Sequence, residues 1–266
     1  MAVVLGAMAG GAAYVMTLPA LRLERLEIKG ADLVSPAAIE AKAREVIRGE
    51  VWGFIPRDNF FFVSSELIER ELRRYFPQLE KVNAAKRFPN RLMIKIEERQ
   101  LWGIYCERQD STRLRPSFAK ATPGEQSSGG QAEPPSSCFY LDTNGTAYEA
   151  LAAFEGWLLP VIYSPAPPTL GQEAARPEML EFYGQAQKAA SSINGQILTM
   201  TMSTTTPADV RLQLAEGWEL WVTAERPTAE WLGVIKSVLE KEIGGRRSEL
   251  DYVDLRFGNK VFYKYK

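Results

Sequence analysis

RFPNRLMIKIEER, residues 87–99, is the most informative stretch of this 266-residue chain. Aliphatic residues occupy alternate positions in its second half: Leu92, Ile94 and Ile96. This alternation predicts a strand over residues 91–99 with one buried face. Pro89-Asn90 interrupts the pattern and predicts a turn, before which residues 79–88 predict another strand. The stretch therefore indicates two consecutive strands joined by a short turn.

One more strand and two helices are predicted between residue 22 and this strand pair. Residues 22–30 alternate in polarity and end at Gly30, which predicts a strand. A helix is expected to begin at the Ser-Pro pair 35–36, because serine caps helix ends and proline fits the first turn. A second helix is expected over residues 64–77, where a double serine precedes an apolar stripe and a proline follows it. The predicted order is strand, helix, helix, strand, strand.

This order resembles a POTRA domain, and residues 87–99 narrow the resemblance to the FtsQ type. In that family the corresponding phrase reads R.FPN.L.I.V.ER, and an N.F.V run precedes the second helix, as NFFFV does here at residues 59–63. Gln100 departs from the family pattern, which usually has proline at this position. The resemblance implies a β-α-α-β-β POTRA domain at residues 22–107. We expect four phenylalanines to pack in its core: Phe60, Phe61, Phe62 and Phe88.

The first 21 residues contain no charged side chain, and charge begins at Arg22. About 20 apolar residues in a helix span the ~30 Å hydrocarbon core of a bilayer. A cleaved signal peptide is one alternative, but Leu18-Pro19-Ala20 does not fit an A-x-A cleavage site. A buried globular helix is another, although such a helix normally has a polar face. We therefore expect residues 1–21 to be an uncleaved transmembrane anchor, with the rest of the chain outside the cytoplasm.

Residues 108–137 differ in composition from their surroundings and are rich in Pro, Gly, Ser and Gln, which predicts a flexible insertion loop. Cys106 and Cys138 lie at the two mouths of this loop, each in a predicted strand. If the two strands pair antiparallel, the cysteines come within bridging distance, and an extracytoplasmic compartment allows a disulfide to form. Two free buried thiols are the alternative.

Residues 138–266 predict a second folded unit that is rich in β-structure. Asn144-Gly145 predicts a hairpin turn, because both residue types accept positive φ angles. Helices are expected at residues 177–193 and 227–243. Strands are expected at residues 138–142, 159–162, 197–204, 209–214, 218–223, 252–257 and 260–265. The fold class is therefore α+β, in which an N-terminal transmembrane helix and a POTRA domain precede a mixed or antiparallel sheet with two or more helices.

The composition argues against an enzyme. The chain has no histidine and a net charge of −1, from 32 Lys and Arg against 33 Asp and Glu. Histidine-dependent triads are thereby excluded, and the commonest zinc ligand is missing. The balanced charge gives no case for nucleic-acid binding. We expect no catalytic residue, no cofactor and no metal ion; hydrolysis of the cell envelope by paired carboxylates is the remaining enzymatic alternative.

The phrase YVDLRF at residues 252–257 resembles a signature near the C-terminus of the FtsQ/DivIB cell-division proteins. The resemblance implies a bitopic divisome scaffold in the cytoplasmic (inner) membrane at the division septum. Such a scaffold recruits small coiled-coil membrane partners of the FtsB/FtsL type by strand addition at its C-terminal sheet, and binds other divisome proteins through its POTRA domain. The implied partner-binding residues are Tyr252, Asp254, Arg256, Phe257, Phe262 and Tyr263. A POTRA module of a protein secretion or envelope assembly system is the alternative.

Overall fold

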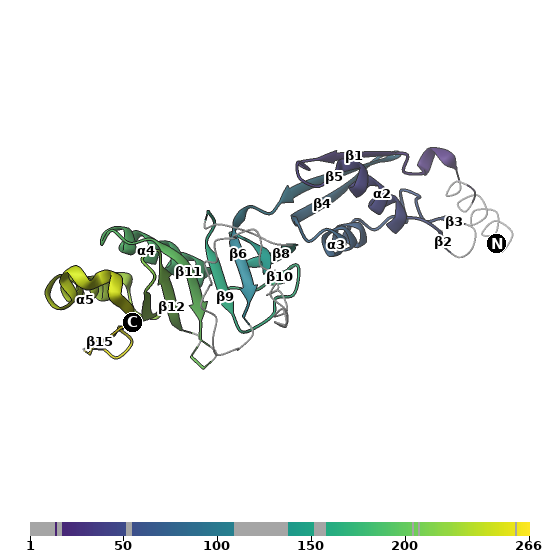
Figure 1. Ribbon diagram of the computed structural model, residues 1–266. Coiled ribbons are helices and arrows are strands. Elements are labelled where there is room, and N and C mark those ends of the chain that lie inside the picture. The colour runs from purple at the N-terminus through teal and green to yellow at the C-terminus, as the bar shows by residue number, and fades with distance from the viewer. Residues whose placement is uncertain are drawn as a thin grey trace, which may run out of the picture. The chain divides into compact units, whose positions relative to one another are not determined.

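The computed structural model describes residue 14 and residues 18–51, 55–108, 138–151, 158–203, 205–206, 208–258 and 260–266 (Figure 1). The chain divides into two compact units, residues 1–100 and residues 101–266. The loop expected at residues 108–137 lies outside the described residues except for Arg108, and so does most of the anchor expected at residues 1–21. In the described part of the chain, no helix combines the length and hydrophobicity needed to cross a bilayer.

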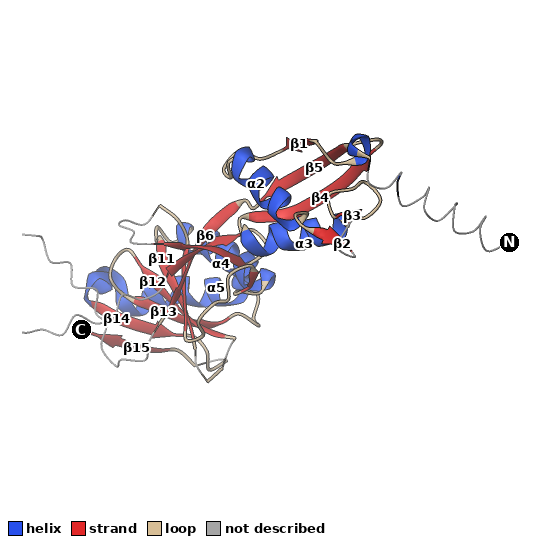
Figure 2. Ribbon diagram, turned by 90° about the vertical axis from the view of Figure 1, so that its right-hand side faces the viewer, coloured by secondary structure: helices blue, strands red, loops and turns tan. Residues whose placement is uncertain are grey.

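The first unit is a three-stranded sheet with two helices packed on one face (Figures 1 and 2). A short 3₁₀ turn, Pro19–Leu21, precedes β1 (Arg25–Lys29), α2 (Pro36–Val46), β2 (Glu50–Val51), β3 (Ile55–Pro56), α3 (Ser65–Tyr75), β4 (Leu79–Arg87) and β5 (Arg91–Glu98). The sheet order is β1-β5-β4, with β1 parallel and β4 antiparallel to β5, while β2 and β3 pair with each other. The predicted order of strands and helices is confirmed, and the β2–β3 pair is an addition to it.

Alternation along β5 explains how the helices pack on the sheet. Leu92, Ile94 and Ile96 are buried together with Ile68 and Leu72 of α3. The residues between them on β5 face away from the helices, because successive side chains of a strand point to opposite faces. Full burial of one such aliphatic side chain stabilises the fold by about 1.5–3 kcal/mol. The helix-covered face therefore holds the core, and the opposite face of the sheet is free to carry charged side chains.

The prediction that four phenylalanines pack in this core is wrong for two of them. Phe88 is 71% exposed and Phe61 is 56% exposed, whereas Phe60 is partly buried. The rings of Phe61 and Phe88 each meet the ring of Phe60 edge to face, with centroids 5.6 and 5.7 Å apart. Phe88 lies in the β4–β5 turn and Phe61 in the loop before α3, so neither takes part in the strand alternation that points side chains inward.

The first unit ends at Gln100, earlier than the boundary predicted at Glu107. The intervening strand, β6 (Leu101–Glu107), belongs to the sheet of the second unit. There it pairs antiparallel with β7 (Cys138–Asp142) and parallel with β9 (Val161–Ser164). Local alternation indicates that residues 101–107 form a strand, but it carries no information about which strands they pair with.

The second unit is built on a ten-stranded mixed sheet, in the order β10-β8-β7-β6-β9-β11-β12-β13-β14-β15. Its other strands are β8 (Thr146–Leu151), β10 (Gln172–Glu173), β11 (Ile197–Met202), β12 (Asp209–Leu214), β13 (Glu219–Thr223), β14 (Leu250–Asp254) and β15 (Phe262–Tyr265). Its helices are α4 (Pro177–Ser191) and α5 (Thr228–Val238). Helix α5 is followed directly by a π-helical turn, Leu239–Ile243, and a 3₁₀ segment, Gly244–Glu249. The predicted α+β class is confirmed.

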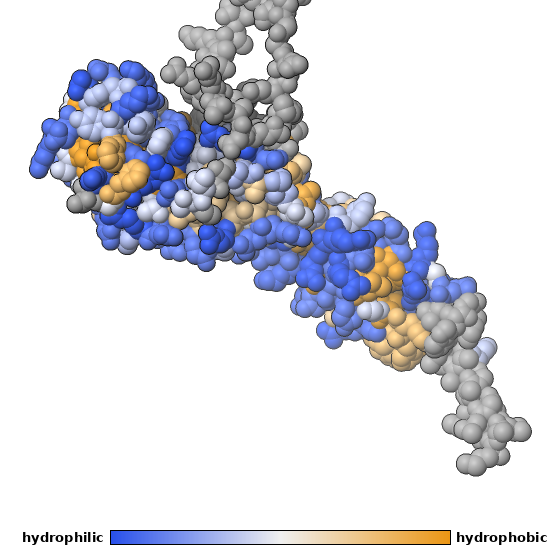
Figure 3. Space-filling view, turned by 90° about the horizontal axis from the view of Figure 1, so that it is seen from below, coloured by the Kyte–Doolittle hydropathy of each residue, from blue (hydrophilic) through white to orange (hydrophobic). Residues whose placement is uncertain are grey.

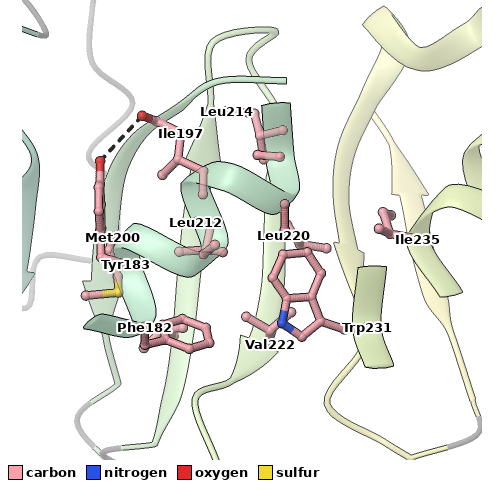
Figure 4. Close-up of a cluster of buried hydrophobic side chains, with 14 of the residues drawn as sticks. Phe182, Tyr183, Ile197, Met200, Leu212, Leu214, Leu220, Val222, Trp231 and Ile235 are labelled. Carbon is pink, nitrogen blue, oxygen red and sulfur yellow. Dashed lines mark hydrogen bonds between the residues drawn. The ribbon is translucent and has the colours of Figure 1, made fainter. Parts of the chain in front are cut away.

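The main core of the second unit lies between α4, α5 and strands β11 to β14 (Figure 4). Side chains of α4 and of the facing strands interlock there: Phe182, Tyr183, Met200 and Leu212. Trp231 of α5 lies over the strand residues Leu220 and Val222 (Figure 4). The hydroxyl of Tyr183 donates to the carbonyl oxygen of Ile197 at 3.4 Å, and burial raises the pKa of Tyr183 to about 12. This core supports one face of the C-terminal strands and leaves their other face uncovered by α4 and α5.

Cys106 of β6 and Cys138 of β7 are directly opposite each other in the antiparallel pair. The two residues are joined by a disulfide, and both are buried. Ile104 and Val161 pack around them in a small apolar cluster. The bond therefore closes the chain between the two strands that flank the predicted insertion loop.

Candidate functional site

The candidate site is the edge of the ten-stranded sheet that is formed by β15. β15 is the last strand in the sheet order and pairs only with β14 among the described residues. An edge strand presents main-chain N–H and C=O groups that have no partner strand, and such an edge accepts a further strand readily. The other edge of the sheet, β10, is a two-residue strand and offers much less main chain.

The hydrogen bond at the end of β15 identifies which of its main-chain groups face outward. The N–H of Lys266 donates to the carbonyl oxygen of Glu249 at 2.9 Å, on the β14 side. Main-chain groups point alternately to the two sides of a strand, so those of Lys264 and Phe262 also face β14. The register shift lies on β14, between Leu250 and Tyr252, and leaves the alternation along β15 regular. The outward groups are therefore those of Tyr263 and Tyr265.

The side chains of the two outward-facing residues are both aromatic. Tyr263 is 40% exposed, and its ring meets that of Tyr265 edge to face with centroids 5.7 Å apart. The guanidinium of Arg246 lies 4.2 Å from the centroid of the Tyr265 ring and donates to its hydroxyl at 2.9 Å. Tyr265 is thus held in place from within the unit, while Tyr263 remains accessible.

On the face opposite α4 and α5, the four C-terminal strands carry an aromatic platform centred on Trp221. Trp221 of β13 pairs in register with Asp254 of β14 and with Arg211 of β12. The Tyr252 ring stacks on the indole, with centroids 4.4 Å apart and an interplanar angle of 11°. The guanidinium groups of Arg211 and Arg256 lie 4.4 and 5.0 Å from the indole centroid. Stacked rings and cations over an aromatic face stabilise each other, so the platform is ordered before any partner binds.

Asp254 fixes the position of Arg256 in this platform. The guanidinium of Arg256 donates from Nε and Nη2 to the two carboxylate oxygens of Asp254, at 2.9 and 2.7 Å, and from Nη1 to Asp209 at 3.2 Å. These hydrogen bonds, led by those that the Asp254 carboxylate accepts, raise the pKa of Arg256 above its ordinary value. Only 4% of Asp254 is exposed. Asp254 therefore positions Arg256 and presents little surface of its own to a partner.

Two further aromatic residues extend the platform toward the edge. Phe257 is 56% exposed and Phe262 is 49% exposed, and their rings meet edge to face with centroids 5.5 Å apart. The guanidinium of Arg256 lies 5.6 Å from the centroid of the Phe257 ring. Exposed aromatic groups beside an arginine are the residue types that dominate protein–protein interfaces. We call the outward main chain of β15, together with Tyr252, Arg256, Phe257, Phe262 and Tyr263, the edge site.

The structure places the six residues expected at this site on β14, on β15 and in the turn between them. Five of them reach the surface, and Asp254 is buried. The sequence reasoning missed Trp221 and Arg211, which lie at the centre of the platform. A signal for Trp221 was present, since Glu219 and Thr223 on either side of it predict that this face of the strand is exposed to solvent.

No group of three or more Asp, Glu or Cys side chains in the described part of the chain is arranged to hold a metal ion. Residues 21–99 match the family model described as POTRA domain, FtsQ-type. The match ends where the first unit ends, next to Gln100. The comparison with curated proteins found no matching protein. The first unit is therefore an FtsQ-type POTRA domain, a kind of domain associated with division scaffolds.

Proposed function

We propose that this chain, whose first unit is an FtsQ-type POTRA domain, is a bitopic division scaffold that captures a small coiled-coil membrane protein at its edge site. In this proposal residues 1–21 anchor the chain in the cytoplasmic membrane. The two folded units lie outside the cytoplasm, where a disulfide between Cys106 and Cys138 is stable. The chain acts at the division septum by binding proteins, and it catalyses no reaction.

The open edge of β15 is the observation that carries the proposal. A partner segment paired with β15 gains main-chain hydrogen bonds from Tyr263 and Tyr265, which supply attraction without regard to sequence. Selectivity then comes from the side chains beside that edge. Phe262 on one face of the sheet and Tyr263 on the other are exposed where a partner strand would lie. If a short helix of the partner follows the added strand, it would contact the Trp221 platform on the face of the sheet that α4 and α5 leave free.

Three substitutions on β15 separate main-chain pairing from side-chain contact. Tyr263→Pro removes an outward N–H and keeps all main-chain hydrogen bonds to β14, since proline is tolerated on edge strands in this orientation. Tyr263→Ala removes the same ring and keeps the N–H. Lys264→Pro removes an N–H that faces β14 and should detach β15 from the sheet. Capture of the partner from envelope extracts by the full-length protein is the measurement, with tryptophan circular dichroism as the check on folding.

We expect Tyr263→Pro to lose capture while the second unit remains folded, and Tyr263→Ala to bind more weakly than the unchanged protein but better than Tyr263→Pro. Lys264→Pro should no longer capture the partner, and its tryptophan circular dichroism signal should decrease because β15 detaches from the sheet. Full capture by Tyr263→Pro would show that the partner does not add a strand to β15. Binding that survives every β15 variant and is lost when the first unit is altered would favour a POTRA-based function in secretion or envelope assembly.

The proposed topology has its own test. A periplasmic reporter fused after Lys266 should be active and a cytoplasmic reporter inactive, and the mature chain should retain residues 1–21. An N-terminus near Ala20, or an active cytoplasmic reporter, would contradict the anchor.

A further inference from the structure

Three arginines form a single row across the outer face of the POTRA sheet. Arg25 of β1 is in register with Arg91 of β5, and Arg91 is in register with Arg87 of β4. All three are exposed on the face away from α2 and α3. Like charges directly opposite each other on neighbouring strands destabilise a sheet. Cross-strand stabilisation of the sheet therefore does not explain this row.

Few acidic side chains of the described residues lie close enough to neutralise the arginine row. Among the described residues that line the pocket beside the row, Glu27 is the only acidic one, with Oε1 3.9 Å from Nη1 of Arg91. None of the ion pairs between described residues includes Arg25 or Arg87. Cross-strand neighbours farther along the same face, Lys29 and Lys95, are also both basic. Arg25 and Arg87 are thus available to an external anion, and among the described residues Arg91 has only the long contact with Glu27.

The row lines an open pocket of about 530 Å³ that also has apolar walls. Phe88, Pro89 and Met93 contribute these walls. Phe88 is in edge-to-face contact with Phe60, which in turn contacts the second exposed ring, Phe61. Figure 3 shows apolar side chains that reach the surface of the first unit among charged ones. A pocket lined by three cations together with an exposed ring and other apolar side chains matches an amphiphile better than it matches a free anion.

This end of the POTRA unit is also the end at which residues 1–21 join it. The N–H of Phe60 donates to the carbonyl oxygen of Leu21 at 2.8 Å, and the N–H of Glu24 donates to the carbonyl oxygen of Asn90 at 3.1 Å. The loop that carries Phe61 and the turn that carries Phe88 therefore flank the point of entry of the apolar N-terminal segment. If that segment crosses the bilayer, both rings lie next to the membrane surface.

We propose that the arginine row binds the phosphate of an anionic phospholipid and that Phe61 and Phe88 enter the boundary between headgroups and acyl chains. Guanidinium groups match phosphate oxygens in charge and geometry, and apolar rings beside basic residues favour the interface of anionic membranes. This contact gives the POTRA domain a second point of attachment to the membrane, in addition to the single N-terminal helix. This inference rests on the proposed anchor at residues 1–21 and is independent of the edge site.

The test uses the full-length chain in nanodiscs, with a fluorophore on Phe61→Cys and quenching spin labels on the lipid. Discs of phosphatidylcholine alone are compared with discs that also contain phosphatidylglycerol. The triple variant Arg25→Gln, Arg87→Gln, Arg91→Gln is compared with Lys29→Gln, Lys81→Gln, Lys95→Gln, which removes the same charge from the same face of the sheet. Capture of the coiled-coil partner is measured in the same discs.

We expect quenching that is stronger in the anionic discs, is lost in the arginine variant and is retained in the lysine variant. Equal quenching in both kinds of disc, or equal loss in both triple variants, would overturn the proposal. Relief of quenching by inorganic phosphate, but not by chloride at equal ionic strength, is expected from competition for the same site, whereas binding of inorganic phosphate without any quenching in the anionic discs would assign the row to a free anion and overturn the proposal. If the unchanged chain shows the expected quenching but does not capture the partner, the result would count against the edge site alone. A chain that fails to enter discs would overturn the anchor and this inference together.

Discussion

The carboxylate of Asp254 accepts hydrogen bonds from both the main-chain N–H and the guanidinium of Arg256. The motif at residues 252–257 predicted that Asp254 contacts a partner. In the structure Asp254 is buried, and it positions Arg256 instead. Sequence could not reveal this, because Asp209 and Trp221, which complete the arrangement, are distant along the chain. Ser64 is the opposite case: its Oγ accepts the N–H of Leu67 at 3.1 Å, and a helix cap depends only on residues within one turn, so it was predictable.

Replacement of Asp254 by alanine should destabilise the second unit by about 2 kcal/mol, because a partly buried guanidinium loses its main charged partner. Asp251→Ala is the matched control. Asp251 pairs with Lys264 at 2.8 Å on the surface, and an exposed pair contributes between about 0 and 1 kcal/mol. Urea unfolding followed by tryptophan fluorescence measures both. Equal losses in the two variants would show that the Asp254–Arg256 pair has no special structural role.

At the scale of elements, the strands and helices were predictable where a local pattern determines them, and their ends were less so. β12 has the bounds predicted for it, residues 209–214, whereas β14 begins at Leu250 and ends at Asp254 instead of spanning residues 252–257. The β14–β15 register shifts between Leu250 and Tyr252, which interrupts the alternation of side chains along β14. No local sequence pattern predicts this shift. The hairpin turn between β7 and β8 was predictable, since Gly145 has a φ of +78° and Asp142 accepts the N–H groups of Asn144 and Thr146.

Two glycine substitutions should have opposite effects on the second unit. At Gly145 an added Cβ would lie 1.8 Å from the carbonyl oxygen of Ala175, and the φ is unfavourable for alanine, so Gly145→Ala should destabilise by more than about 1 kcal/mol. Gly233, inside α5, has nothing within 4 Å of an added Cβ. Gly233→Ala should therefore stabilise by about 0.5–1 kcal/mol, the helix preference for alanine over glycine. Thermal unfolding of the two variants gives the comparison, and a stable Gly145→Ala would contradict the described turn.

At the scale of the whole molecule, the sequence predicted a POTRA unit followed by a β-rich unit, and the boundary between them was placed too late. Residues 101–107 follow the last POTRA strand directly, and only their pairing with β7 and β9 shows that they belong to the second sheet. The order of ten strands in that sheet was likewise beyond local patterns, because it pairs strands that are not consecutive in the chain: β8 with β10, β6 with β9 and β9 with β11. The identity of β15 as the edge strand follows from that order, and the proposed capture of a partner depends on it.

Amide hydrogen exchange of β15, measured residue by residue with and without the captured partner, is the sharpest test of strand addition at this edge. In the free protein the N–H groups of Phe262, Lys264 and Lys266 face β14 and should exchange slowly, whereas those of Tyr263 and Tyr265 should exchange rapidly. Addition of the partner should slow exchange at Tyr263 and Tyr265 and leave the first unit unchanged. Unchanged exchange at these two residues in the presence of bound partner, with new protection elsewhere, would contradict strand addition at the C-terminal edge.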